Sequence, residues 1–153
     1  MVYLVLIVGL IALDQISKML VVNYVRPIDT LPVIDKFFHL TYVENRGAAF
    51  GFFKDNQMIF VIIAIIATLL GLYYLLIKKQ SAFFSVIISL IVAGAIGNMI
   101  DRVRIGYVID FLDFRFIWQY VFNVADSYLV VGTILLCVYI LFVDGKAKQN
   151  ETK

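Results

Sequence analysis

The sequence predicts an all-α integral membrane protein, with four transmembrane helices that carry a small β-sheet and a connecting segment at one membrane face. Two observations lead to this fold class. The chain of 153 residues is 63% hydrophobic and 16% charged, whereas soluble domains are about 45–50% apolar and about 25% charged. It also contains four apolar runs, each about long enough to cross the ~30 Å hydrocarbon core as a helix. Within a single domain, residues 1–153, the expected spans are residues 2–22, 57–77, 82–100 and 126–143.

The first span carries two charges inside the motif D-Q-I-S-K. It lacks the basic start and the small-residue cleavage pattern of a signal peptide, so we expect a retained helix. Asp14 and Lys18 are four residues apart, which places them on one helical face where they can pair. The pair is either a structural device that makes two charges tolerable in a membrane or a direct part of a site.

The segment from 23 to 56 has a different character. Pro27 and Pro32 exclude a continuing helix. The run from Phe37 to Val43 is rich in aromatic and β-branched residues and predicts a strand. It is followed by N-R-G-A-A-F, from Asn45 to Phe50, whose small residues permit close backbone approach. We expect a short sheet on the membrane surface, although this last motif alone is equally typical of an ordinary turn.

The later spans are joined by two different connections. The second span ends at Lys78 and Lys79, and the third holds a run of small residues that suits tight helix packing: Ala93, Gly94, Ala95 and Gly97. The segment from 101 to 125 is polar and aromatic, and its Trp118 and Tyr120 suit the headgroup level. A polar tail follows the fourth span.

The polar motifs fall on one membrane face. D-Q-I-S-K lies late in span one and N-R-G-A-A-F lies before span two, while G-N-M-I-D-R closes span three and F-N-V-A-D opens span four. Successive spans alternate in direction, so all four motifs meet at the same side. Ionisable groups at the edge of a membrane mark a functional site by default.

The charge distribution leaves the orientation of that face open. The polar face holds more basic residues than the other, but its loops also hold many acids, whereas the Lys78–Lys79 turn has none. The two sets are Arg26, Lys36, Arg46, Lys54, Arg102, Arg104 and Arg115 against Lys78, Lys79, Lys146, Lys148 and Lys153.

The residue inventory restricts the chemistry to carboxylates. A net charge of +2 and the absence of a basic run argue against nucleic acid. One histidine (His39) and one cysteine (Cys137) cannot form a zinc site of the usual kind. We therefore expect no metal and no cofactor, and a pair of aspartates that share one proton and hydrolyse an amide with water.

Four aspartates compete for that role. Asp126 should lie in the first turn of span four, with Asn123 as N-cap, where a helix N-terminus favours the ionised form. Asp110, in the strand-like V-I-D-F, is its natural partner. Asp101, beside Arg102 at a helix end, is interpreted as scaffold, and Asp113 as a solvated loop acid.

The five motifs D-Q-I-S-K, N-R-G-A-A-F, G-N-M-I-D-R-V, V-I-D-F and F-N-V-A-D-S, in this order, closely resemble those of bacterial lipoprotein signal peptidase (signal peptidase II). The resemblance extends from Asp14 to the end of span four. It implies an aspartyl endopeptidase with Asp110 and Asp126 as catalytic residues. It places supporting or substrate-binding roles on Asp14, Lys18, Asn45, Gly47, Asn98, Asp101, Arg102, Asn123 and Ala125.

The resemblance also implies the biological setting. The substrate would be a prolipoprotein, cut before its diacylglyceryl-modified cysteine. The enzyme would be a multi-pass protein of the bacterial cytoplasmic (inner) membrane, with a β-cradle and the active site at the extracytoplasmic face. We further expect contact with membrane phospholipid and a monomeric state.

Three other classes of protein are compatible with parts of the pattern. A proton-coupled transporter would relay protons through Asp14, Lys18 and Asp126, but its essential acid would be expected near the membrane midplane. A Mg²⁺-dependent phosphotransferase would use the acids with Arg102 and Arg104. A purely structural subunit leaves the one-sided clustering unexplained.

Overall fold

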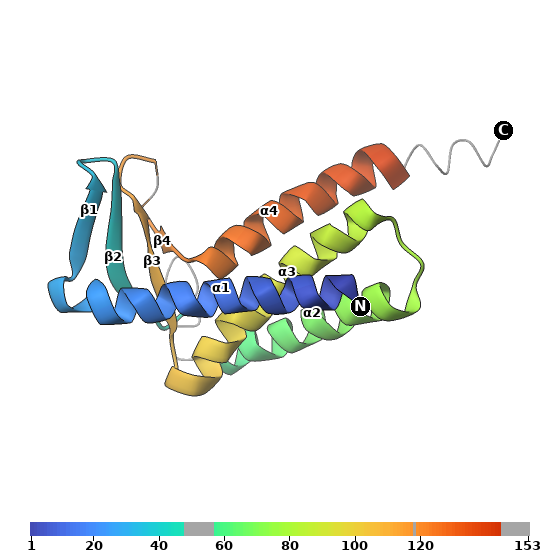
Figure 1. Ribbon diagram of the computed structural model, residues 1–153, viewed down its shortest axis with the longest axis horizontal. Coiled ribbons are helices and arrows are strands. Elements are labelled where there is room, and N and C mark those ends of the chain that lie inside the picture. The colour runs from blue at the N-terminus through green and yellow to red at the C-terminus, as the bar shows by residue number, and fades with distance from the viewer. Residues whose placement is uncertain (48–56, 118, 145–153) are drawn as a thin grey trace.

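The computed structural model describes residues 1–47, 57–117 and 119–144 (Figure 1). Residues 48–50 of the N-R-G-A-A-F motif, Trp118 and the polar tail therefore lie outside the described residues. The expected fold class is confirmed: four long apolar helices form a bundle, and a four-stranded antiparallel sheet lies at one end of it.

The helices are α1 (Val2–Tyr24), α2 (Gln57–Ile77), α3 (Ala82–Ile105) and α4 (Val124–Tyr139). A 3-10 turn, η1 (Arg26–Ile28), follows α1, and a π-helical turn, η3 (Ile140–Asp144), follows α4. Each span is long and apolar enough to cross a membrane. Helix α3 is the central helix, because it packs against α1, α2 and α4.

Helix α3 is longer than the sequence pattern predicts. It continues five residues beyond the expected end at Ile100 and stops at Gly106, which adopts the left-handed conformation (φ 78°) that glycine tolerates. Asp101 and Arg102 consequently lie in the last turns of the helix rather than in a connecting segment. Helix α4 begins two residues before Asp126.

Small residues allow the helices to approach closely at α3. A Cβ atom on Gly94 would lie 2.5 Å from the carbonyl oxygen of Ala125, and one on Gly97 would lie 2.7 Å from Oδ2 of Asp14. A Cβ on Gly71 would collide with Val92. Tight helix packing at the glycines of this stretch is therefore confirmed.

The sheet has the strand order β1-β2-β3-β4. The strands are β1 (Thr30–Ile34), β2 (Phe38–Asn45), β3 (Val108–Phe114) and β4 (Val121–Phe122). The expected strand from Phe37 to Val43 is thus present, shifted by one or two residues at its ends. A hydrophobic cluster of Val21, Val25, Ile109 and Phe111 fixes the end of α1 against this sheet.

The register of β2 with β3 separates two aspartates. Asp110 is opposite Val43 and Asp113 is opposite His39, and a bulge lies between these pairs. Because side chains alternate along a strand, Asp110 and Asp113 point to opposite faces of the sheet. The interpretation of Asp113 as a solvated loop acid is wrong: it is a strand residue whose side chain is 15% exposed.

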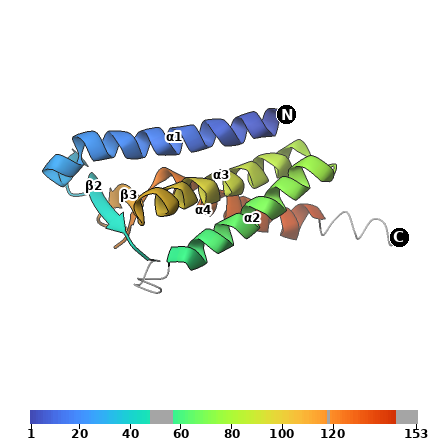
Figure 2. The same cartoon turned by 90° about the horizontal axis from the view of Figure 1, so that it is seen from below.

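The two ends of the bundle differ in content. The sheet and the ends of α1 and α3 that carry the polar motifs lie together at one end (Figures 1 and 2). The N-terminus, the turn between α2 and α3 and the C-terminal end of α4 lie at the other. This arrangement is the one expected from the alternating direction of the spans.

Candidate active site

Asp126 lies in the first turn of α4, where it takes part in a capping box. Asn123 is the N-cap, and its Oδ1 accepts from the Asp126 backbone N–H at 2.8 Å. In return, Oδ2 of Asp126 accepts from the Asn123 backbone N–H at 3.2 Å. This reciprocal pair fixes the Asp126 carboxylate at a helix N-terminus, a position that favours negative charge.

Asp110 reaches the same point from strand β3, where the residue is 2% exposed. Its Oδ1 accepts from Nδ2 of Asn123 at 2.6 Å, and its Oδ2 accepts from Nδ2 of Asn45 at 2.8 Å. Asn123 therefore contacts both aspartates, one through its amide nitrogen and the other through its amide oxygen. The two carboxylates flank a single asparagine.

A second asparagine, Asn98 on α3, supports Asp126. Its Nδ2 donates to Oδ1 of Asp126 at 2.7 Å. Its Oδ1 accepts from Nζ of Lys18 at 3.1 Å and from Nδ2 of Asn123 at 3.1 Å. Because an ammonium can only donate, Lys18 fixes which end of the Asn98 amide points toward Asp126.

Lys18 is buried between two carboxylates. Its Nζ lies 2.9 Å from Oδ2 of Asp14 and 2.9 Å from Oδ2 of Asp101, and the three side chains are 2%, 0% and 5% exposed. The pairing of Asp14 with Lys18 expected from their spacing is thus observed, and Asp101 is a second partner that spacing did not suggest. Burial of charge is tolerable here because each charged group has partners.

Both carboxylates of this group also bind backbone. Oδ1 of Asp14 accepts from the Ala125 N–H at 2.9 Å, which ties α1 to the first turn of α4. Oδ2 of Asp101 accepts from the Ile109 N–H at 3.2 Å, which ties α3 to the strand that carries Asp110. The ion pairs therefore hold the two elements that present the catalytic candidates.

Asn45 is itself held by the chain that follows it. Its Oδ1 accepts from the Gly47 backbone N–H at 3.1 Å, which leaves Nδ2 directed at Asp110. The expected supporting positions Asn45 and Gly47 therefore lie beside Asp110.

The environment of Asp110 changes its titration. Burial, and next the negative charge of Asp126, raise the pKa of Asp110 from 3.8 to about 7. The hydrogen bonds from Asn45 and Asn123 act in the opposite direction and limit the rise. A carboxyl group with this pKa holds a proton through much of the neutral range, as a general acid must.

Arg102 lies at the edge of this centre. Its Nη1 is 3.5 Å from the Asn98 carbonyl oxygen, and the charges of Asp126 and Asp110 act on its guanidinium. Arg102 stacks over the ring of Phe60 on α2, at 4.8 Å from its guanidinium carbon to the ring centroid.

The other singled-out residues, Asp113, His39 and Cys137, lie away from this centre. Asp113 accepts from Thr41 Oγ1 at 2.8 Å and from Arg115 Nε at 3.1 Å on the other face of the sheet. His39 is a buried residue of β2, and Cys137 is exposed on α4.

Gln15 is a site residue that the sequence reasoning did not single out. Its Nε2 lies within hydrogen-bonding distance of Asp14 Oδ2 (3.2 Å), the Gly97 carbonyl (3.2 Å) and Asp101 Oδ1 (3.0 Å). It therefore supplies donors between two carboxylates. The available signal was its place inside D-Q-I-S-K, next to Asp14. Among the described residues, no three His, Cys, Asp or Glu side chains are grouped so that they could hold a metal ion.

Comparison with known proteins agrees with this geometry. The sequence profile of the family described as "Signal peptidase (SPase) II" matches residues 6–142. A protein of Clostridioides difficile (strain 630) named "Lipoprotein signal peptidase" is 54% identical over 148 residues, which are 97% of this chain and 100% of that protein. A protein of the same name from Caldanaerobacter subterraneus is 44% identical over 93% of this chain and 97% of its own length.

A solved structure has the same fold. It is described as a bacterial membrane enzyme determined by the in meso method at 1.9 Å resolution, and it is 34% identical to this chain. The two superimpose with a TM-score of 0.82 over 93% of this chain and 94% of the other.

The four spans, the carboxylate-bearing site at one end of the bundle and the likeness to a bacterial membrane enzyme identify the class of this protein as a multi-pass membrane enzyme. The chain belongs to the signal peptidase II family, a family of aspartic peptidases. The resemblance inferred from the five motifs is thereby confirmed.

Proposed function

We propose that this protein removes signal peptides from prolipoproteins by hydrolysing the bond before a diacylglyceryl-modified cysteine, with Asp110 and Asp126 as the catalytic pair. The observation that carries the proposal is that both carboxylates bind Asn123, one from a helix N-terminus and one from a buried strand position. The family and the names of the relatives support the substrate class.

The two environments suit two roles. Asp126, at the start of α4, is the ionised member and takes a proton from the attacking water. Asp110, whose pKa is raised to about 7, is the protonated member. Its carboxyl O–H donates a hydrogen bond to the oxygen of the scissile carbonyl. As the tetrahedral intermediate collapses, the proton gained from water passes to the leaving amine. Water attacks directly, so no acyl-enzyme forms.

The surrounding residues position this pair and do not react. Asn98 and Asn123 orient Asp126, and Asn45 and Asn123 orient Asp110. The buried group of Asp14, Lys18 and Asp101 fixes Asn98 and holds α4 and β3 in place. We further propose that the protein acts as a monomer.

The location of the pair suits a lipid-anchored substrate. Asp126 is at the start of an apolar helix that is long enough to span the membrane, so it lies near the membrane surface. A cysteine whose acyl chains remain in the bilayer keeps its peptide bond at this depth. We assign the site to the extracytoplasmic face of the bacterial cytoplasmic membrane, with both chain ends on the cytoplasmic side.

Cysteine labelling tests the orientation. In a Cys137→Ala background, Gln80→Cys places a thiol in the α2–α3 turn and Lys36→Cys places one in the β1–β2 turn. An impermeant thiol reagent applied to intact cells should modify the second and spare the first. The opposite pattern would overturn the orientation.

Cleavage of a purified lipidated prolipoprotein, read by mass spectrometry of the fragments, tests the mechanism. Asp110→Asn and Asp126→Asn should each lower the rate by at least about 10²–10⁴-fold, because loss of general acid–base action removes that much. The double variant should be scarcely worse than either single one, since the two act as a unit. Asp113→Asn is the matched control and should lose a few-fold at most.

The outcomes are distinct. A dead Asp113→Asn with an active Asp110→Asn would mean that the pair is misassigned. Two active single variants would exclude the aspartyl mechanism. Activity should also persist in EDTA, whereas a metal-dependent reaction would stop.

A further inference from the structure

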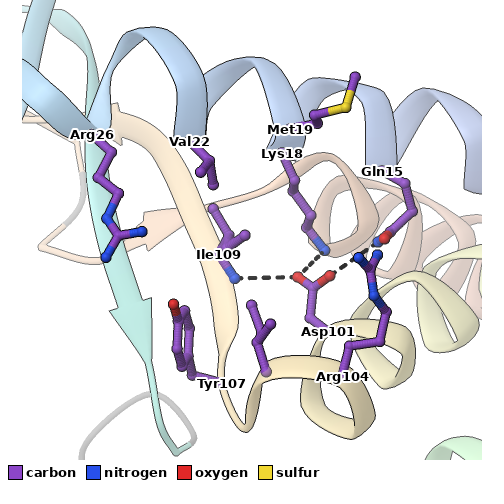
Figure 3. A pocket seen from close by; sticks show the side chains of 10 residues that line it. Gln15, Lys18, Met19, Val22, Arg26, Asp101, Arg104, Tyr107 and Ile109 are labelled. Atoms are coloured by element: carbon purple, nitrogen blue, oxygen red, sulfur yellow. Dashed lines mark hydrogen bonds and ion pairs between the residues drawn. The ribbon is translucent and has the colours of Figure 1, made fainter.

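We propose that the pocket between the C-terminal ends of α1 and α3 binds the phosphate-bearing headgroup of an anionic membrane phospholipid. The pocket has a volume of about 260 Å³. Figure 3 shows Arg26, Arg104 and Tyr107 around it and Asp101 at its inner wall, where Lys18, Gln15 and the Ile109 N–H contact that carboxylate.

The lining is cationic. Three cations, Lys18, Arg26 and Arg104, face the pocket together with one carboxylate, Asp101. Lys18 and Asp101 already satisfy one another at the inner wall. Two arginines therefore remain with no counter-charge in the lining.

Neither arginine has a carboxylate within ion-pairing distance among the residues that the structure describes. The guanidinium of Arg26 stacks over the ring of Tyr42 at 5.3 Å, a contact that uses its face and leaves its N–H groups free to donate at the edge. Guanidinium groups bind phosphate oxygens through paired, charge-assisted hydrogen bonds. Two such groups line this one pocket, from opposite sides in Figure 3, and supply the donors that an anionic phosphate needs.

The other wall of the pocket indicates a lipid rather than a free anion. Met19, Val22, Ile105 and Ile109 line it with apolar surface. Met19 and Ile105, which are 55% and 41% exposed, extend this surface out of the pocket along the two spans. A phosphate ion would leave these side chains uncovered, whereas the glycerol and the start of the acyl chains of a phospholipid would cover them.

The size and position of the pocket agree with a headgroup. Pockets that hold a whole drug-sized ligand measure about 300–1,000 Å³, so this one takes a headgroup while the acyl chains lie outside along the helices. It opens where α1 and α3 end, at the level where headgroups meet a membrane protein. Basic pockets between spans bind anionic headgroups on the cytoplasmic side of membranes, and the same charge-assisted chemistry applies at this end of the protein.

Lipid binding to the full chain in a neutral detergent tests the proposal, by native mass spectrometry and by thermal shift. The probes are phosphatidylglycerol, phosphatidylcholine of the same acyl chains, and inorganic phosphate. We expect phosphatidylglycerol to bind at least about tenfold more tightly than phosphatidylcholine, and inorganic phosphate to have no effect at matched concentration.

Arg26→Gln and Arg104→Gln should each weaken phosphatidylglycerol binding about tenfold, as expected for the loss of one charge-assisted pair. Arg115→Gln is the matched control, because Arg115 is an exposed arginine of the same end of the protein that already pairs with Asp113. It should bind phosphatidylglycerol as the unmodified chain does. None of these measurements depends on cleavage, so they stand apart from the proposed peptidase function.

The alternatives give different results. Equal binding of the two lipids, or tight phosphatidylglycerol binding by the Arg26→Gln/Arg104→Gln double variant, would overturn the site. Arginine-dependent stabilisation by inorganic phosphate alone would show a free-anion site and overturn the lipid assignment. If the double variant is unfolded in the thermal scan, the single variants and Arg115→Gln decide the question, and equal lipid binding by all three would also overturn it.

Discussion

Replacement of Lys18 by methionine is the most direct test of the buried ion group, because this one ammonium serves two carboxylates. Asp14 and Asp101 are 0% and 5% exposed, and both lie 2.9 Å from Nζ of Lys18. Methionine fills a similar volume but supplies no charge and no donor. Lys18→Met therefore leaves two buried carboxylates without their cation.

Loss of one partner of a buried ion pair costs about 3–5 kcal/mol of the free energy of unfolding. For a chain of about this length, 1 kcal/mol shifts the melting temperature by about 2–4 °C, so Lys18→Met should lower it by roughly 6–20 °C. Asp14→Asn should cost only about 1–2 kcal/mol, since Lys18 keeps Asp101 and an amide oxygen can still accept from Ala125.

Thermal unfolding of the purified protein in detergent measures these shifts. The Asp14→Asn/Lys18→Met double variant should be more stable than Lys18→Met alone but should not recover fully, because Asp101 stays unpaired. Lys79→Met is the matched control: Lys79 is exposed at the other end of the bundle, and its loss should change stability by no more than about 0.5 kcal/mol. The reasoning is refuted if Lys18→Met is no worse than Lys79→Met, or if the losses in the double variant simply add.

Three further results are expected. The cleavage rate should fall as pH rises above about 7, because the catalytic form needs a protonated Asp110 and its carboxyl loses the proton with a pKa of about 7; a pH–rate profile that stays flat to pH 9 would contradict this. Gly97→Ala should lower the free energy of unfolding by about 1–3 kcal/mol by overpacking, whereas Gly9→Ala, where no atom lies within 4 Å of the added Cβ, should not. Asn123→Ala should lower the free energy of unfolding by about 0.5–2 kcal/mol through loss of the α4 N-cap, and should also abolish cleavage. Ser81→Ala, which removes the N-cap of α3, should lower only the stability. Equal cleavage by these two variants would argue against a positioning role for Asn123.

Local pattern was sufficient for the spans and for one half of the proposed pair. Apolar runs of about 20 residues have few alternatives to a membrane helix, so the four spans follow from composition alone. The capping of α4 by Asn123 is also local, because it joins residues three apart, and it places Asp126 at the helix start. The spacing of Asp14 and Lys18 likewise suffices for their pairing.

The other half of the site depends on contacts between distant segments. Lys18 binds Asn98, 80 residues further along the chain, and Asn45 binds Asp110 across 65 residues. No local sequence rule predicts that the Lys18 ammonium forms its second ion pair with Asp101 instead of contacting solvent. The role of Gln15 was missed for the same reason, since two of its three acceptors, Gly97 and Asp101, lie on α3.

The strand-like V-I-D-F and the family resemblance already favour Asp110 over Asp113, but the physical basis of that preference required the tertiary structure. In the sequence the two are neighbouring acids of one polar stretch, and nothing in their own chemistry distinguishes them. The strand pairing of β3 with β2 does, because an odd spacing puts them on opposite faces and the register puts Asn45 beside one and Thr41 beside the other. The sequence by itself determines which residue types reach the end of the bundle, but the sheet determines which carboxylate is buried against α4, where burial and the charge of Asp126 raise its pKa.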